Sequence, residues 1–129
     1  MTDLGKTGIT QVRTVTVPVE NPDRALEFYV GTLGMEVRVD AEFNEGQRWI
    51  EVAPAGAETT ISLAPPGDVP AGRDSGIRLA TQDAGVDHAS LLERGVDVDP
   101  EVMRWPGVPP MFSLRDPDGN TLYVVQSAE

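Results

Sequence analysis

The chain of 129 residues contains no cysteine and a single histidine. Without cysteine it can form neither a disulfide nor a thiolate metal site, and this usage favours a reducing compartment. Basic residues are also scarce, since Lys and Arg total 10 against 21 Asp and Glu, a formal net charge of -11. This balance argues against nucleic acid and against anionic membrane surfaces as partners, because both attract basic patches.

Long apolar runs are missing as well. No stretch approaches the ~20 apolar residues that a membrane-spanning helix needs, and the opening residues MTDLGKTG lack the charged and apolar regions of a signal peptide. We therefore expect a cytoplasmic protein that does not enter the membrane. With 40% hydrophobic and 24% charged residues the composition is that of a globular protein, and the length suits one domain with a real core.

The clearest local pattern predicts a helix between two strands. Asn21 is a typical N-cap, because its side-chain oxygen can accept a first-turn N–H, and Pro22 suits the first helical position. Gly34 can end the helix, since glycine enters the left-handed conformation without strain. Apolar runs at 12–19 and 35–40 predict the flanking strands. The residues expected on the buried face of the helix are Ala25, Leu26, Tyr29 and Leu33.

The second half of the sequence repeats this order. Asp83 can cap a helix that runs to Arg94, and the sequence DPDGN at 116–120 predicts a hairpin turn. Each half thus reads β–α–β–β–β, and such a repeat is more informative than a single motif. We place the first module at about residues 10–65, a Pro- and Gly-rich connector at 65–76 and the second module at 76–127. The other expected strands are 48–52, 59–63, 77–81, 96–102, 111–115 and 121–125.

Three motifs in this order, DRALEFYVGTLGMEV, ASLLERGV and DPDGNTLYVV, make the chain resemble the vicinal oxygen chelate superfamily over about residues 10–127. That superfamily includes glyoxalase I, bleomycin-resistance proteins, fosfomycin-resistance enzymes and extradiol dioxygenases. The resemblance implies an α+β fold in which two βαβββ modules form a curved mixed sheet cup, with the helices outside and the ligand inside. It also implies a homodimer, and it leaves open whether one chain or two complete each cup.

Alternation along the strands separates two faces. The apolar face, expected beneath the helices, comprises Val15, Val17, Val19, Ile61, Leu63, Ile77, Leu79, Leu122 and Val124. A fully solvated opposite face would carry more Lys and Glu than this one, so its small hydroxyls with one Arg and one Tyr favour the lining of a pocket. An ordinary exposed sheet face is the alternative. The side chains that we predict to bind a ligand are Thr14, Thr16, Trp49, Glu51, Ser62, Arg78, Met111, Arg115 and Tyr123.

Within this set Arg78 and Tyr123 are the expected polar anchor. A guanidinium offers a planar fork of donors to a carboxylate, and a phenol adds a directional hydrogen bond. Alternatively, Arg78 pairs with an acid such as Glu51 and only braces the strands. Glu51 is also the best acid or base candidate, because a carboxyl group beside Trp49 in a partly apolar cup could have a raised pKa. The alternative for Glu51 is a solvated surface acid.

The resemblance also locates the positions at which metal-dependent relatives carry His or Glu ligands. Here these positions hold Thr14, Ser62, Gly76 and Tyr123, and hydroxyls alone are poor ligands for zinc, iron or nickel. We therefore expect no metal and no other cofactor. The single histidine, His88, shares a helix face with Ala84, Leu91 and Leu92, so we expect a structural role away from the cup rather than a ligand or base.

The segment from Met103 to Phe112 concentrates Trp105 with three prolines. Such a stiffened apolar loop suits a pocket rim or a dimer contact, and the alternative is a plug for the core. The function that we expect is metal-free binding of a small organic molecule, as in the bleomycin-resistance branch. Alternatively, the protein is a lyase, isomerase or oxygenase-like enzyme that uses Glu51, Arg78 or Tyr123, or a metal held by unconventional ligands. A purely structural module is the third possibility.

Overall fold

The computed structural model describes residues 7–127. Residues 1–6, which belong to the opening stretch in which we expect no signal peptide, lie outside this range. None of the helices in the described part of the chain is long and apolar enough to cross a membrane. The first half comprises β1 (Thr14–Pro18), α1 (Pro22–Leu26), the π-helix η1 (Glu27–Thr32), β2 (Glu36–Asn44), β3 (Gln47–Ala53) and β4 (Thr60–Ala64). The second half comprises β5 (Asp74–Thr81), α2 (Ala84–Glu93), β6 (Asp97–Val98), β7 (Met111–Arg115) and β8 (Thr121–Gln126).

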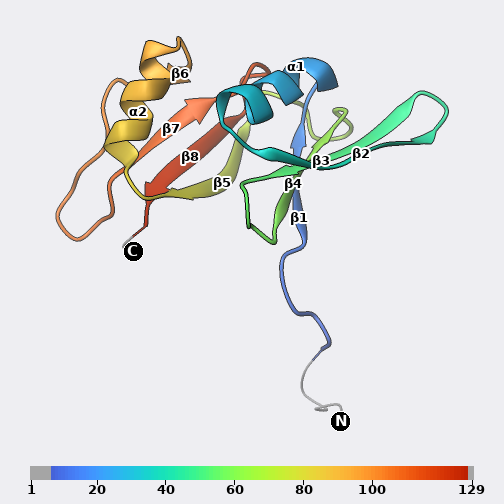
Figure 1. The fold of residues 1–129 in the computed structure, drawn as a ribbon, viewed down its shortest axis with the longest axis horizontal. Coiled ribbons are helices and arrows are strands. Elements are labelled where there is room, and N and C mark those ends of the chain that lie inside the picture. Colours follow the sequence, from blue (N-terminus) through green and yellow to red (C-terminus); the bar gives the residue numbers. More distant parts are fainter. Residues whose placement is uncertain (1–6, 128–129) are drawn as a thin grey trace.

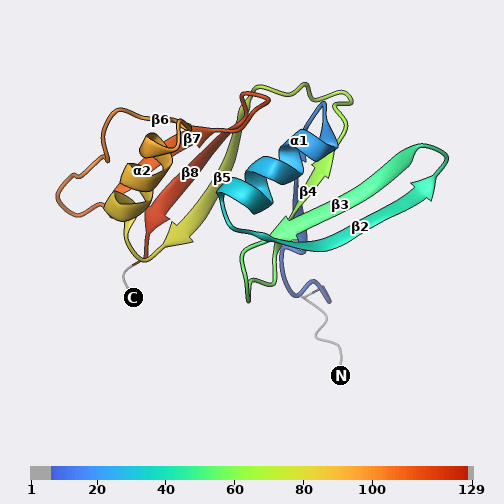
Figure 2. The same ribbon diagram turned by 45° about the horizontal axis from the view of Figure 1, so that its top comes forward.

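Each half forms its own four-stranded mixed sheet, with the orders β1-β4-β3-β2 and β5-β8-β7-β6. The first strand of each half pairs in parallel with the last, and the remaining pairs are antiparallel. The α+β fold of two βαβββ modules is therefore confirmed. Both helices lie on the same side of the two sheets, and the β2–β3 hairpin extends away from the rest of the molecule (Figures 1 and 2). We call the opposite sides of the sheets the open faces.

The first helix differs from the sequence prediction in its second half. Asn21 caps it as expected, accepting from the backbone N–H of Arg24 at 3.1 Å, and Gly34 ends it in the left-handed conformation at φ 81°. From Glu27 onward, however, the helix is of the wider π type. Phe28 is buried beside Tyr29, three and four residues after the buried Ala25, although the predicted buried face did not include it.

The expected strand at 96–102 is much shorter than predicted, because β6 ends at Val98. Asp99 turns its carboxylate onto the backbone N–H of Ser113 at 2.7 Å, and Pro100 has no N–H with which to continue the ladder. In the loop that follows, Trp105 is 64% exposed. The loop therefore does not plug the core with its tryptophan, and a rim or interface role stays a prediction.

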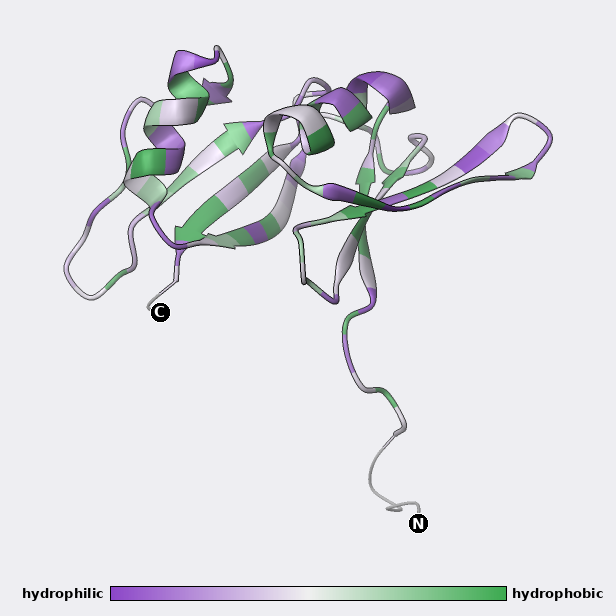
Figure 3. Cartoon of the chain, viewed as in Figure 1, coloured by the Kyte–Doolittle hydropathy of each residue, from purple (hydrophilic) through white to green (hydrophobic). Residues whose placement is uncertain are grey.

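The predicted apolar strand face is confirmed. The nine residues of the apolar face all belong to the core or pack against it, and the resulting alternation is visible along β5 and β8 (Figure 3). His88 is buried on the helix side, where its ring meets the edge of Phe112 and its Nε2 lies 2.7 Å from the backbone oxygen of Asp99. Leu92 was wrongly placed on the buried face of α2, because its side chain is 53% exposed.

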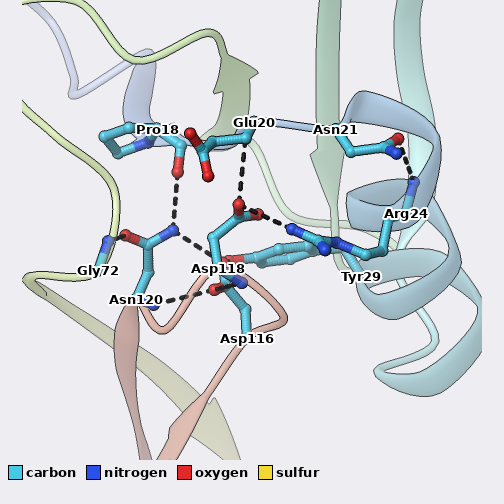
Figure 4. A network of polar contacts seen from close by, with 9 residues as sticks. All are labelled: Pro18, Glu20, Asn21, Arg24, Tyr29, Gly72, Asp116, Asp118 and Asn120. Carbon is cyan, nitrogen blue, oxygen red and sulfur yellow. Dashed lines mark hydrogen bonds and ion pairs between the residues drawn. The ribbon is translucent and has the colours of Figure 1, made fainter.

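The turn between β7 and β8 joins the two modules (Figure 4). The hydroxyl of Tyr29 in η1 donates to Oδ2 of Asp116 at 2.8 Å, and both side chains are buried. Asn120 donates to the same oxygen at 3.0 Å and to the backbone oxygen of Pro18 at 2.8 Å. Burial, followed by the charge of Asp116, raises the pKa of Tyr29 far above its usual value. The phenol therefore remains a neutral donor to a buried carboxylate.

Asp118, in the same turn, forms a second link. Its Oδ1 accepts from the backbone N–H of Glu20 at 3.1 Å and from the guanidinium of Arg24 at 3.0 Å (Figure 4). The Asp118 side chain is only 1% exposed. We call the contacts of Tyr29, Asp116, Asp118 and Asn120 the module joint. Two of the motifs by which the chain resembles the superfamily, DRALEFYVGTLGMEV and DPDGNTLYVV, thus meet in the structure. Their contacts fix the position of one sheet relative to the other.

Candidate functional site

The open face of the second sheet carries the predicted anchor. Arg78 on β5 and Tyr123 on β8 are direct neighbours in register, and the guanidinium carbon lies 4.8 Å from the centre of the phenol ring. Arg78 is exposed and donates one hydrogen bond, at 2.9 Å, to the backbone oxygen of Gly76. A guanidinium offers five N–H donors, so this contact leaves most of the fork available to a ligand.

The hydroxyl of Tyr123, which we expected to bond a ligand, has a partner within the protein. It donates to Asp74, a residue that sequence reasoning missed. Asp74 shares the strand parity of Arg78, and the β5–β8 register shifts between them, around Gly76 at φ 71°, so that Asp74 lies opposite Thr121, two positions from Tyr123. Hydrogen bonds from Tyr123 and from the backbone of Gly76 lower the pKa of Asp74. The ring of Tyr123 therefore supports Arg78, while its hydroxyl holds a carboxylate.

Arg115, at the end of β7, is held by two acids next to the edge strand β6 of the same sheet. Its guanidinium lies 3.2 Å from both Asp97 and Asp99, and it also donates to the hydroxyl of Ser113 at 2.7 Å. Burial opposes the charge of Asp99, but the backbone and hydroxyl of Ser113 and then Arg115 lower its pKa overall. Arg115 is thus already paired, which makes it a brace for this edge and leaves Arg78 as the more available cation.

Glu51 dominates the open face of the first sheet. It accepts from Nε1 of Trp49 at 2.6 Å and from the hydroxyl of Thr60 at 2.7 Å, and only 5% of the residue is exposed. These two hydrogen bonds lower its pKa more than desolvation raises it. The expectation of a raised pKa was therefore wrong, because the neighbouring indole acts as a donor rather than as an apolar wall.

The other predicted residues of this face lie around Glu51. Ser62 is its neighbour in register on β4, and Thr16 on β1 is the neighbour of Ser62. The hydroxyl of Thr14 donates to the backbone oxygen of Thr60 at 3.3 Å. The Ser62 hydroxyl is buried and has no hydrogen-bond partner within the described residues. This face is therefore a row of small hydroxyls that ends at a carboxylate.

The predicted site residues thus form two groups, one on each sheet. Among residues 7–127 no hydrogen bond or ion pair joins Arg78 to Glu51, so the alternative that these two brace each other has no support. Met111 lies at the start of β7, half-buried, and bridges to Met103. A hollow of about 290 Å³ lies between β1 and the beginning of β5, lined by Thr16, Pro18, Val69, Pro70, Arg73, Asp74, Ser75 and Asn120.

The four positions of a superfamily-type metal site do not fit a metal ion. Thr14 and Ser62 are hydroxyls on the first sheet, and Gly76 has no side chain. Tyr123 directs its hydroxyl to Asp74. None supplies the imidazole or carboxylate that zinc, iron or nickel prefer. Within residues 7–127 no cluster of three or more His, Asp or Glu side chains is arranged to hold a metal ion.

The dependence of folding stability on pH in the acid range should reveal the lowered pKa of Glu51. A carboxyl group whose folded-state pKa is lowered stabilises the fold above its unfolded pKa, near 4.5, and this contribution is lost as pH falls through the folded-state value. We expect Glu51→Gln to flatten the pH dependence of the free energy of unfolding in this acid range, because the amide does not titrate. Urea unfolding at pH 7 and at successively lower pH measures the difference. Equal acid slopes for wild type and variant would contradict it.

Comparison with known proteins gives one family. A model described as the glyoxalase/bleomycin resistance protein/dioxygenase superfamily matches residues 11–124. TnmS3, an antibiotic binding protein from Streptomyces sp. CB03234, is 35% identical with a TM-score of 0.84, over 95% of this chain and 100% of that one. A superfamily member from Sphaerobacter thermophilus is 32% identical with a TM-score of 0.86, over 92% and 98% of the two chains. The uncharacterized protein YetH of Bacillus subtilis is 28% identical over 116 residues, covering 87% of this chain and 94% of YetH.

Proposed function

Because the chain belongs to the glyoxalase/bleomycin resistance protein/dioxygenase superfamily, we propose that it binds a small organic molecule at the open faces of its sheets and does so without a metal. The observation that carries this proposal is the exposed guanidinium of Arg78, stacked on Tyr123 at 4.8 Å and paired with no carboxylate in the described part of the chain. The similarity to an antibiotic binding protein over 95% of the chain supports it. An aromatic molecule with a carboxylate or carbonyl group would suit an Arg–Tyr pair.

We also propose that a second copy completes the cup. The β2–β3 hairpin extends from the body and exposes an edge-to-face pair, Phe43 and Trp49, with ring centres 6.4 Å apart. Exposed aromatic side chains of this kind are characteristic of protein interfaces. We expect light scattering after size-exclusion chromatography to give the mass of a dimer. Phe43→Ser should shift the equilibrium towards monomer, and a wild-type protein that is monomeric at all accessible concentrations would contradict this arrangement.

The binding experiment uses mass spectrometry of the purified protein. Native spectra, followed by extraction under denaturing conditions, detect a molecule that copurifies, and incubation with a panel of aromatic antibiotics tests added ligands. Recovery of the bound compound unchanged is the expected result, because sequestration requires no turnover. Consumption of the compound with appearance of a product would favour the alternative, an enzyme that uses Glu51, Arg78 or Tyr123 or a metal held by unconventional ligands.

Metal analysis gives a further test. We expect no transition metal near one equivalent per chain after dialysis, and we expect a chelator to leave the melting temperature unchanged. A metal bound to the native state alone would stabilise it by mass action, so its removal would lower the melting temperature. Zinc, nickel or iron that survives dialysis at stoichiometric level would show that unconventional ligands hold a metal.

A further inference from the structure

A second hollow, of about 250 Å³, lies between the two modules on the side of the sheets that carries the helices. It is bounded by the end of η1, by α2 and by the turn between β3 and β4. Leu79 and Val124 line it with the strand faces that point towards the helices, and Ala80 and Thr81 border it at the end of the edge strand β5. We call it the helix-side groove. Its apolar floor consists of Leu33, Met35, Leu79, Leu91 and Val124.

Polar side chains from α2 form one wall of the groove. Asp87, Ser90 and Arg94 are three and four residues apart, so they share one face of the helix. Arg94 donates to the backbone oxygen of Thr32 at 2.7 Å, which anchors its guanidinium at the groove. Within the described residues Arg94 has no ion-pair partner closer than 4.0 Å. One bond uses a single donor of its five, so the others can serve a ligand.

Asp87 limits the charge that the groove can accept. Its carboxylate accepts a short hydrogen bond from the hydroxyl of Thr81. It precedes Arg94 by seven residues, or about 10 Å along the helix axis. A single anionic group can therefore pair with Arg94 while the rest of the ligand stays apolar. A second anionic group would approach Asp87 in a protein whose net charge is already -11.

The rims of the groove are held in place without a ligand. Arg38 donates to the backbone oxygens of Pro54 and Ala57, at 2.9 and 2.8 Å, and so fixes the turn between β3 and β4. On the other side Gly34, at φ 81°, ends the π-helix, and a Cβ there would meet no atom within 4 Å. Pockets that bind small molecules are usually preformed in this way, and π-helical turns are frequent at functional sites.

From these features we propose that the helix-side groove is a second binding site, distinct from the cup, for a small monocarboxylate with an apolar body. The apolar floor takes the body, and Arg94 with the hydroxyl of Ser90 takes the carboxylate. A volume of about 250 Å³ equals roughly eight waters at about 30 Å³ each, which suits one ring with one carboxylate. The site does not depend on the proposed function of the open faces.

The test is a titration of the full-length, ¹⁵N-labelled protein with benzoate, followed by amide chemical shifts, with neutral benzamide as the matched ligand. We expect saturable benzoate shifts at Gly34, Leu91 and Arg94, with tighter binding of benzoate than of benzamide. Arg94→Met should weaken benzoate binding at least fivefold and benzamide binding less, because benzamide carries no charge. Arg104→Met, which removes an exposed arginine outside the groove, should bind benzoate as wild type does.

A blocking variant completes the experiment. Ser90 is an exposed helix position, so Ser90→Trp should fold normally and fill the groove, which should abolish the benzoate shifts. The proposal is overturned if benzoate gives no saturable shifts at the groove, if its shifts lie only around Arg78 and Tyr123, or if either groove variant binds benzoate like wild type. It is also overturned if Ser90→Trp changes the mass measured by light scattering, because the groove would then be a contact between protein chains.

Discussion

Replacing Arg78 with methionine is expected to weaken binding of the copurifying or antibiotic ligand by about 1.5–3 kcal/mol, the range for hydrogen bonds to charged groups. This corresponds to a roughly 10- to 150-fold increase in Kd. Methionine keeps much of the stem volume over the Tyr123 ring but removes the charge and the donors. Because Arg78 is exposed and its one hydrogen bond is to a residue two positions away, the melting temperature should change little. Isothermal titration calorimetry and thermal unfolding measure the two effects separately.

Two further variants separate the parts of this anchor. Tyr123→Phe keeps the ring beneath the guanidinium and removes only the bond to Asp74, so its effect on binding should be small. Arg115→Met breaks ion pairs with Asp97 and Asp99 and should lower stability more than affinity. If Arg78→Met binds the ligand like wild type while Arg115→Met does not, the anchor lies at Arg115 on β7.

Removing one oxygen from the module joint should destabilise the whole domain. In Tyr29→Phe, Oδ2 of the buried Asp116 loses its phenol donor and keeps only the amide of Asn120. The expected loss is about 1.5–3 kcal/mol in the free energy of unfolding, because a buried carboxylate loses a charge-assisted bond. For a domain of this size the melting temperature should fall by on the order of 5–15 °C. Urea unfolding at pH 7 gives the free energy.

The loss of folding stability at alkaline pH provides a second readout for the same variant. The folded-state pKa of Tyr29 is raised, so its contribution to stability is complete below the unfolded value near 10 and is lost as pH rises above it. The wild type should therefore lose more stability above pH 10 than Tyr29→Phe does. Tyr123→Phe is the matched control, since it also removes a phenol–carboxylate bond, but an exposed one. Equal effects of the two substitutions on stability would contradict the role given to the joint.

Local patterns in the sequence determined much of this fold. The caps of the two helices are local: Asn21 and Asp83 each accept from a backbone N–H three residues further on. Gly34 ends the first helix through its own backbone conformation. Strand alternation predicted both faces of the sheets, because the direction of successive side chains depends only on the backbone of one strand. For the same reason the sequence placed Arg78 and Tyr123 on one open face.

Tertiary structure decided what these side chains do. Whether Glu51 has a raised or a lowered pKa depends on the orientation of the Trp49 indole and the Thr60 hydroxyl, and no spacing in the sequence specifies that orientation. Asp74 reaches Tyr123 through an irregularity at Gly76, and Tyr29 meets Asp116 across 87 positions in the chain. Such contacts form only when separate elements pack together, so their geometry follows from the position of one module on the other and not from the local sequence.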